Sequence, residues 1–249
     1  MEQVSDKARL RELLGVERDL HIYELGDLDD FFWPRTRWFV RGGAVVLLYD
    51  APGLPVVVGL GGDPELPGLL AALQGTLPAR VYAHLSPGLA AAFAPRFGDQ
   101  PHGAFAKYAL ARPALGPDDP GCARLGPGDR AELEAFYAAA YPGNWFDPRM
   151  LETGQYVALR QAGAIVAAGG VHVYSPAEGV AALGNIAVAP DRRGAGLGRR
   201  VTAAVCRSLR ASVARIGLNV RADNAAAIAC YQRLGFRFVA PYEEHLFQS

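Results

Sequence analysis

The sequence has no surplus of charge of either sign and no long hydrophobic run. Its 249 residues include 25 basic and 25 acidic side chains, so the formal net charge at neutral pH is zero. A protein that binds nucleic acid or an anionic membrane through its overall charge carries a basic surplus. The longest apolar stretch, Ala162 to Val171, is about half of the ~20 residues that a membrane-spanning helix needs. We therefore expect no nucleic-acid partner and no membrane association.

Cysteine is also scarce, and the first residues lack the pattern of a secretion signal. The three cysteines, Cys122, Cys206 and Cys230, are far apart and include no Cys-x-x-Cys pair, so they predict neither a disulfide framework nor a zinc site. The first nine residues mix charges of both signs, whereas a signal peptide has a basic segment followed by an apolar one. We expect a cytoplasmic protein with reduced thiols and no metal.

What the sequence does have is enough apolar residues for two cores, with a break between them. Hydrophobic residues make up 51% of the chain, and its length suits one large domain or two small ones. The segment from Ala111 to Gly121 is dense in proline and glycine, which interrupt helices and strands. We therefore predict two domains, 1–115 and 116–249.

The second half predicts a mixed α/β sheet with one parallel crossover. Hydrophobic periodicity and turn residues indicate, in order, a helix at 129–140, strands at 155–160, 164–174 and 179–188, a glycine-rich turn, a helix with Leu197, Val201, Val205 and Leu209 on one face, a strand at 215–220, a helix with Ile228, Tyr231 and Leu234, and extended chain at 236–239. Asp223 is the expected N-cap of the last helix, and Gly235 is its expected left-handed end.

The first half shows a weaker version of the same order. We expect strands at 36–41, 44–49, 55–60, 80–84 and 103–111, with helices at 64–74 and 87–95. A duplication of one fold explains both halves. Before the aromatic residues Phe31 to Trp33, the acids Asp27, Asp29 and Asp30 are expected to form an exposed acidic run.

The most informative segment runs from Asn185 to Arg200 and holds three glycines, Gly194, Gly196 and Gly198, between an apolar strand and an amphipathic helix. Glycine lets backbone N–H groups approach a ligand, and a helix N-terminus attracts anions, so this turn suits a phosphate. Seven arginines lie from Arg192 to Arg215, and the one acid beside them is Asp191, directly before Arg192. The alternative is a sharp turn with a solvated arginine surface.

The sequence lacks the pattern of a P-loop and disfavours a Rossmann site. A P-loop requires Gly-Lys-Ser/Thr, which the sequence lacks, and a Rossmann site requires its first glycine directly after the strand. In this chain, residues 189–193 intervene. The segment Val188 to Gly198 instead resembles the acetyl-coenzyme A loop of the GNAT N-acetyltransferase superfamily, with its pattern Arg/Gln-x-x-Gly-x-Gly/Ala met by Arg193, Gly196 and Gly198.

A second motif supports the resemblance. From Asn219 to Phe236 the chain has an Asn at a helix start, then Ala-x-x-x-Tyr, then Leu-Gly-Phe, which is similar to the next GNAT motif. The resemblance covers about residues 122–249. The first half, in which Gly59 to Gly62 is the nearest approach to the loop pattern, looks like a degenerate copy, as in tandem GNAT proteins.

The resemblance implies acetyl-CoA as cosubstrate and assigns the residues that would bind it. The cofactor set is Ile186, Ala187, Val188, Arg193, Gly194, Ala195, Gly196, Leu197, Gly198, Arg199, Asn224 and Tyr231. In this set the backbone N–H groups of the loop hold the pyrophosphate and the strand residues pair with pantetheine. The N–H of Val188 is the candidate oxyanion donor, and Asn224 is alternatively an ordinary polar residue at a helix start.

Tyr231 stands where GNAT enzymes commonly carry a tyrosine acid. A phenol, with a pKa of ~10, is protonated at neutral pH and can give its proton to a leaving thiolate, with a pKa of ~8.5. The alternative is an aromatic residue that only packs. The base stays open among His172, Glu178 and Glu152. His172 lies between valines as a core histidine would, and Glu178 reads as a solvated turn residue.

The acceptor pocket is expected to include Tyr141, Asn144, Trp145 and Phe146, unless these residues form a hydrophobic plug under a Pro-Gly loop. The resulting hypothesis is an acetyl-CoA-dependent N-acetyltransferase in which a primary amine of a small molecule attacks directly within a ternary complex. The alternative is a non-catalytic acyl-CoA binding or sensing module. Neither the acceptor nor the oligomeric state follows from the sequence.

Overall fold

The computed structural model describes residues 1–51 and 53–249 and divides them into two compact units. Unit 1 contains Met1–Lys107, Val220–Asn224 and Phe238–Ser249, and unit 2 contains Tyr108–Asn219 and Ala225–Arg237. The units are therefore not the consecutive stretches 1–115 and 116–249, because C-terminal residues belong to unit 1. A boundary near residue 115 stays a prediction for the two copies of the fold.

Unit 1 is a mixed sheet with three short helices. Its elements are β1 (Glu2–Val4), α1 (Lys7–Leu14), α2 (Ile22–Gly26), β2 (Thr36–Arg41), β3 (Ala44–Tyr49), β4 (Val56–Gly59), α3 (Leu66–Leu73), β5 (Arg80–Leu85), and most of β6 (Gly98–Leu110) and β12 (Phe236–Gln248). The strand order is β1-β2-β3-β4-β5-β12-β6. Neighbours from β1 to β4 are antiparallel, and β4 pairs with β5 in parallel.

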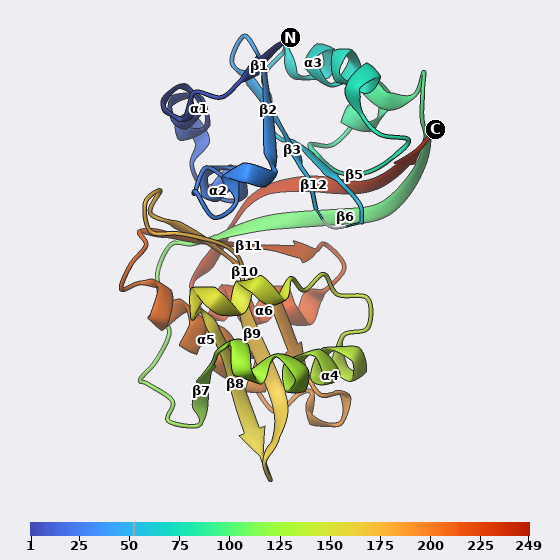
Figure 1. The fold of residues 1–249 in the computed structure, drawn as a ribbon. Helices are drawn as coiled ribbons and strands as arrows, with labels where there is room; N and C mark the ends of the chain where they lie inside the picture. Colours follow the sequence, from blue (N-terminus) through green and yellow to red (C-terminus); the bar gives the residue numbers. More distant parts are fainter. Residues whose placement is uncertain (52) are drawn as a thin grey trace. The chain divides into compact units, whose positions relative to one another are not determined.

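The C-terminal strand completes the sheet of unit 1. Residues Glu243 to Gln248 of β12 pair antiparallel with Leu85 to Arg80 of β5, and Figure 1 shows β12, in red, next to β5. Phe247 is fully buried, and its ring stacks on Phe93 with the ring centroids 4.3 Å apart. Unit 1 thus depends on residues from the far end of the chain for part of its core.

Unit 2 repeats this plan. Its elements are β7 (Cys122–Leu125), α4 (Arg130–Ala140), β8 (Tyr156–Gln161), β9 (Ala164–Ser175), β10 (Val180–Val188), α5 (Leu197–Leu209), α6 (Ala225–Arg233) and the first part of β11 (Arg215–Arg221). Its strand order is β11-β10-β9-β8-β7. Strands β7 to β10 pair antiparallel, and β10 pairs with β11 in parallel. In the described residues, no helix is long and apolar enough to cross a bilayer.

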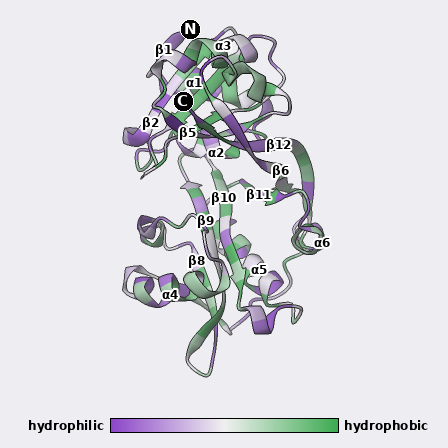
Figure 2. Ribbon diagram, turned by 90° about the vertical axis from the view of Figure 1, so that its right-hand side faces the viewer, coloured by the Kyte–Doolittle hydropathy of each residue, from purple (hydrophilic) through white to green (hydrophobic). Residues whose placement is uncertain are grey.

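Two helices of unit 2 cover opposite faces of its sheet. Tyr156 contacts the ring of Phe146 beside α4, whereas Leu159 joins a core cluster with Leu197 and Val201 of α5. Residues three apart on a strand point to opposite faces, so α4 and α5 lie on different sides. Figure 2 shows α4 carrying both hydrophilic and hydrophobic colour, as an amphipathic helix does.

Most of the predicted elements are present, with some corrections. The segment at 87–95 is not an α-helix but a short 3-10 helix, Leu89–Phe93. The last strand does not stop near residue 239 but continues to Gln248. Helix α6 begins at Ala225, so Asp223 lies one residue before the N-cap position, and its carboxylate pairs with Arg221 at 2.7 Å. Strands β1 and β7 and helices α1 and α2 were not predicted.

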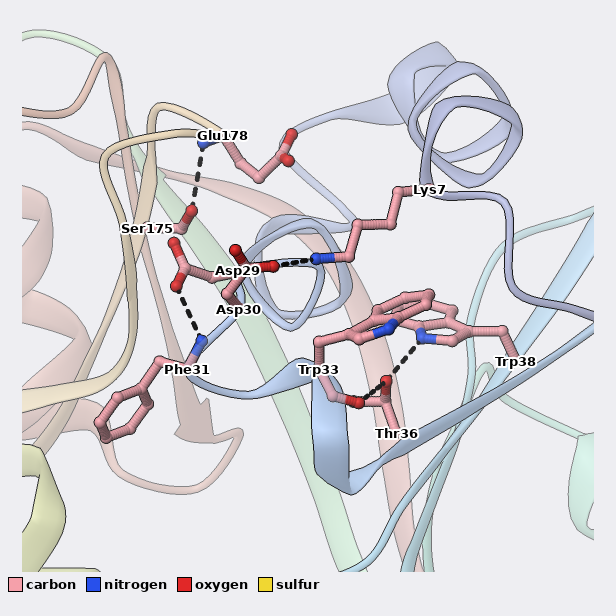
Figure 3. A network of polar contacts seen from close by, with 9 residues as sticks. All are labelled: Lys7, Asp29, Asp30, Phe31, Trp33, Thr36, Trp38, Ser175 and Glu178. Atoms are coloured by element: carbon pink, nitrogen blue, oxygen red, sulfur yellow. Dashed lines mark hydrogen bonds and ion pairs between the residues drawn. The ribbon is translucent and has the colours of Figure 1, made fainter.

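The acidic run before Phe31 is only partly exposed. Asp30 is exposed and forms an ion pair with Lys7 at 2.6 Å, and Asp29 accepts a hydrogen bond from the N–H of Phe31 at 3.1 Å (Figure 3). Asp27, in contrast, is 7% exposed. Its burial, together with the negative charge of Glu24, raises the pKa of Asp27 well above its usual range.

Candidate functional site

Strand β10 of unit 2 contains an irregularity where the cofactor strand was expected. Its register with β9 shifts between Gly184 and Ala187, and Asn185 adopts φ of 55°. A positive φ is uncommon for any residue but glycine, and asparagine tolerates it better than most. The extra residue is a β-bulge, a feature that re-aims the chain next to functional sites.

Beyond the bulge, β10 loses its partner on one side. The parallel register with β11 runs from Val180, opposite Arg215, to Leu183, opposite Leu218. Among the residues that the structure describes, no β11 partner is assigned from Gly184 to Val188. That edge offers backbone N–H and C=O groups to a ligand with amides of its own, as an added strand would.

The contacts of Asn185, at the start of the segment expected to bind the cofactor, were not predicted from the sequence. Its Nδ2 donates to the hydroxyl of Tyr156 at 3.1 Å, and its backbone carbonyl accepts from the hydroxyl of Tyr137 at 2.9 Å. Burial raises the pKa of both tyrosines, so both stay neutral. The signal available in the sequence was an asparagine in an otherwise apolar strand, next to a glycine.

The glycine loop follows this strand and leads into α5. Gly194 and Gly196 have φ of 81° and 76°, and Gly196 is the N-cap of α5. The first N–H groups of the helix have no acceptor within it, and its first turn contains no acidic residue. The loop therefore presents unpaired donors at the positive end of a 13-residue helix, the arrangement that binds phosphate.

Two of the arginines around the loop form ion pairs with acids of the same unit. Arg200 forms two hydrogen bonds to Asp119, at 2.6 and 3.0 Å, and lowers the pKa of that carboxyl to about 2. Arg207 pairs with Asp118 at 3.0 Å. Both acids come from the proline-rich segment before β7, far in sequence from the arginines of residues 192–215. Part of the expected positive potential is thus neutralised within unit 2.

Tyr231 is buried in α6, with 8% of its surface exposed. Burial raises the pKa of its hydroxyl, and the neighbouring groups Cys230, Tyr141 and Cys206 raise it further. The phenol is therefore held protonated, the form that a proton donor needs. The ring also packs on Phe236, with the centroids 5.9 Å apart, so the packing role expected as the alternative exists beside any chemical one.

The three candidate bases lie in different surroundings. His172 is on β9, where its ring occupies the space that a Cβ at Gly184 would overlap, and it contacts the ring of Trp145 with the centroids 5.7 Å apart. Glu178 is 7% exposed, so it is not the solvated turn residue that was expected; its backbone N–H donates to Ser175 Oγ at 3.1 Å (Figure 3). Glu152 is exposed, in the 3-10 helix Pro148–Thr153.

The acceptor-side residues lie on the loop after α4, and each approaches another part of the site. Asn144 Nδ2 donates to Asn185 Oδ1 at 3.3 Å, and the ring of Phe146 packs between Tyr137 and Tyr156. Trp145 and Tyr141 remain 44% and 48% exposed. The plug interpretation thus fits Phe146, while the two exposed aromatic side chains are open to a ligand.

Asn224 does not join this set. It falls in the segment Val220–Asn224, which belongs to unit 1, and its contact with the cofactor stays a prediction. The contacts join three parts of unit 2, namely the bulge in β10, the loop that follows it, and the acceptor-side loop, through Asn144–Asn185 and through Arg193.

Part of unit 2 is similar in sequence to known acetyltransferases. Residues 122–236 match the model of the acetyltransferase (GNAT) family. A mycothiol acetyltransferase from Saccharopolyspora erythraea is 54% identical to the chain over 52 residues, which are 20% of this chain and 17% of the relative. The chain therefore matches less than a fifth of the length of that relative.

The fold as a whole resembles solved structures. A GNAT-family protein from Novosphingobium aromaticivorans aligns over 94% of this chain and 99% of its own, with a TM-score of 0.68 and 23% identity. A tandem GNAT protein from the clavulanic acid biosynthesis pathway aligns over 98% of this chain and 97% of its own, with a TM-score of 0.56 and 18% identity. The prediction of a mixed α/β, tandem GNAT-like fold is confirmed. Residues 122–236 thus form a domain of the acetyltransferase (GNAT) family.

Proposed function

We propose that unit 2 binds acetyl-CoA and transfers its acetyl group to a primary amine of a small molecule. The observation that carries this proposal is the unpaired edge of the bulged strand β10, which leads directly into the glycine loop at the N-terminus of α5. An edge for amides and a donor cluster for a diphosphate, joined in one segment, suit a long ligand that has both groups.

In this proposal the donor lies along β10 and the loop. Ile186, Ala187 and Val188 pair with the pantetheine amides, and Val188 N–H is the donor to the developing oxyanion. The N–H groups of the loop and first helical turn hold the pyrophosphate, a set comprising Arg193, Gly194, Ala195, Gly196, Leu197, Gly198 and Arg199. Asn224 is the further cofactor contact proposed from the resemblance.

The amine nitrogen attacks the thioester carbonyl carbon, forming the C–N bond, and the C–S bond then breaks. Tyr231 donates its proton to the departing sulfur, because burial keeps the phenol protonated and also disfavours a free thiolate. The proton that the amine loses goes to a base, for which His172, Glu178 and Glu152 remain the candidates, directly or through water. No metal is required for any of these steps.

The acceptor would lie against Tyr141, Asn144, Trp145 and Phe146. The three cysteines are free, which supports a reducing compartment, and we place the reaction in the cytoplasm.

Calorimetry with acetyl-CoA tests the first half of the proposal, and a thiol-release assay over a panel of small amines tests the second. Tyr231→Phe is expected to lower kcat about 100-fold with little change in acetyl-CoA affinity. The matched control is Tyr174→Phe, which removes a hydroxyl bonded to Ser212 at the surface of the same unit. The control should keep full activity.

The outcomes separate the hypotheses. Failure of the wild-type protein to bind acetyl-CoA would remove the proposed function. Tight binding without thiol release for any amine would instead support an acyl-CoA binding or sensing module. Equal activity of Tyr231→Phe and Tyr174→Phe would assign Tyr231 to packing alone.

A further inference from the structure

The side chain of Arg193 donates to two backbone carbonyls of unit 2. Its Nη2 donates to the carbonyl of Ala140 at 3.1 Å, and its Nε donates to the carbonyl of Val188 at 3.4 Å. Ala140 is the last residue of α4. Carbonyls in the last turn of a helix have no intrahelical donor, and a cation there is favourable. The guanidinium thus joins the end of α4 to the end of β10.

The acceptor-side loop begins at this junction. Tyr141 directly follows α4 and leaves the helical conformation, with φ of −147° and ψ of 63°. Three residues further on, Asn144 Nδ2 donates to Asn185 Oδ1 at 3.3 Å. The loop is therefore attached at two points, once to the glycine loop through Arg193 and once to the bulge through Asn185.

Both attachment points belong to the segment proposed to bind the cofactor. Asn185 is held in its left-handed conformation by the hydroxyls of Tyr156 and Tyr137, so its amide has a fixed direction. A pyrophosphate on the N–H groups of the glycine loop would in turn fix the backbone of Arg193. A ligand that fixes both residues also restrains the loop that they hold.

We propose that Arg193 and Asn185 are positioning residues that couple occupancy of the cofactor site to the conformation of the acceptor-side loop, Tyr141 to Phe146. The inference rests on the proposed function, because it requires acetyl-CoA to bind along β10 and the glycine loop. It gives the side chain of Arg193 a task separate from that of its backbone N–H, which the proposed function assigns to the pyrophosphate and which a side-chain substitution leaves in place. By linkage, an acceptor that orders the loop also strengthens cofactor binding by the same factor.

Hydrogen exchange measured by mass spectrometry tests the coupling without a known acceptor. In the wild-type protein, saturating acetyl-CoA should slow exchange of the amides between Tyr141 and Phe146 by about 10-fold, within the usual range of coupling between sites. Arg193→Gln removes the charged donor to α4. It is expected to bind acetyl-CoA within about threefold of wild type by calorimetry while losing most of this protection.

Two further variants make the test specific. Arg192→Gln is the matched control, because Arg192 is the neighbouring exposed arginine and pairs only with Asp191 among the contacts described for its side chain; it should keep the protection. Asn185→Gly suits the positive φ but removes the amide, so it should lose protection as Arg193→Gln does. Its melting temperature reports whether the unit remains folded.

The following outcomes would overturn the proposal. Protection that persists in both Arg193→Gln and Asn185→Gly would overturn the proposal. So would a loss of acetyl-CoA affinity of about 10-fold or more in Arg193→Gln, which would mean that the guanidinium contacts the phosphates. Binding by the wild type with no protection of the loop overturns this inference but leaves the proposed function, whereas no binding at all removes both.

Discussion

The two units place a helix after a parallel-paired strand in the same way, yet only one of these junctions suits a phosphate. In unit 2, β10 leads through a glycine turn into α5, and in unit 1, β4 leads through Gly61 and Gly62 into α3. Both junctions are rich in glycine, so glycine alone does not distinguish them. The difference lies in the strand edge and in the charge at the helix start.

The strand edges differ in pairing. β4 is paired with β5 along its whole length, from Val56 opposite Tyr82 to Gly59 opposite Leu85. β10 loses its parallel partner after Leu183. Unit 1 thus offers no unpaired stretch of β4 on that side, whereas unit 2 leaves room for the backbone of a ligand.

The helix starts differ in chemistry. At α3, the carboxylate of Asp63 accepts a hydrogen bond from the N–H of Glu65 at 2.8 Å, and Pro67 in the first turn has no N–H to offer. Glu65 is itself the N-cap and pairs with Arg41 at 2.6 Å. Carboxylates stabilise a helix start by the same interaction that a phosphate would make. In unit 1, carboxylates of the unit itself occupy the start of α3. In unit 2, the first N–H groups of α5 stay available to a ligand.

Phe247→Ala is expected to have the largest effect on unit 1, because it removes a buried ring that β12 supplies to the core of this unit. We expect the free energy of unfolding of unit 1 to fall by about 3–5 kcal/mol. Urea unfolding followed by tryptophan fluorescence measures this, since Trp33 and Trp38 lie in unit 1 and Trp145 in unit 2. Val16→Ala, at a position that is 85% exposed, should change stability little. A loss below about 1 kcal/mol for Phe247→Ala would contradict the role given to β12.

Gly196→Val tests whether the two glycine turns differ in acetyl-CoA binding. A β-branched residue is strained at φ of 76°, and its side chain would stand among the donors of the loop. Calorimetry should show acetyl-CoA affinity reduced about 100-fold, equivalent to ~2.7 kcal/mol. The same change in unit 1, Gly61→Val, also meets a positive φ, 113°, with no heavy atom within 4 Å of the new Cβ. Reduced binding in Gly61→Val as well would mean that the turns do not differ in function.

The smallest effect concerns a buried acid found in unit 1. Asp27 has a raised pKa, because of its burial first and of Glu24 second, so it favours folding below its unfolded pKa of ~3.9 and this contribution is lost as pH rises towards its folded value. Asp27→Asn should therefore raise the melting temperature at pH 7 by about 2–4 °C, the size of a ~1 kcal/mol change. The gain should shrink towards pH 4. An equal shift at both pH values would show that Asp27 is ionised in the fold.

The sequence predicted those parts of unit 2 that follow from local patterns. Apolar periodicity placed α5, and alternating glycines marked the loop before it, because both signals lie within a few neighbouring residues. Residues 243–248 were not predicted as a strand, since their pairing with β5 is set by residues far away in the chain. The burial of Glu178 and Asp27, and the bulge at Asn185, likewise depend on packing that local composition does not encode.

The placement of β12 also bears on how the protein is made. The edge of β5 that pairs with Glu243 to Gln248 leaves the ribosome long before its partner does. At about 5–20 residues per second, the delay is on the order of ten seconds. During that time all of unit 2 is synthesised while an apolar strand edge of unit 1 stays available to other chains. Unit 1 therefore cannot complete its sheet until the residues up to Gln248 have been synthesised.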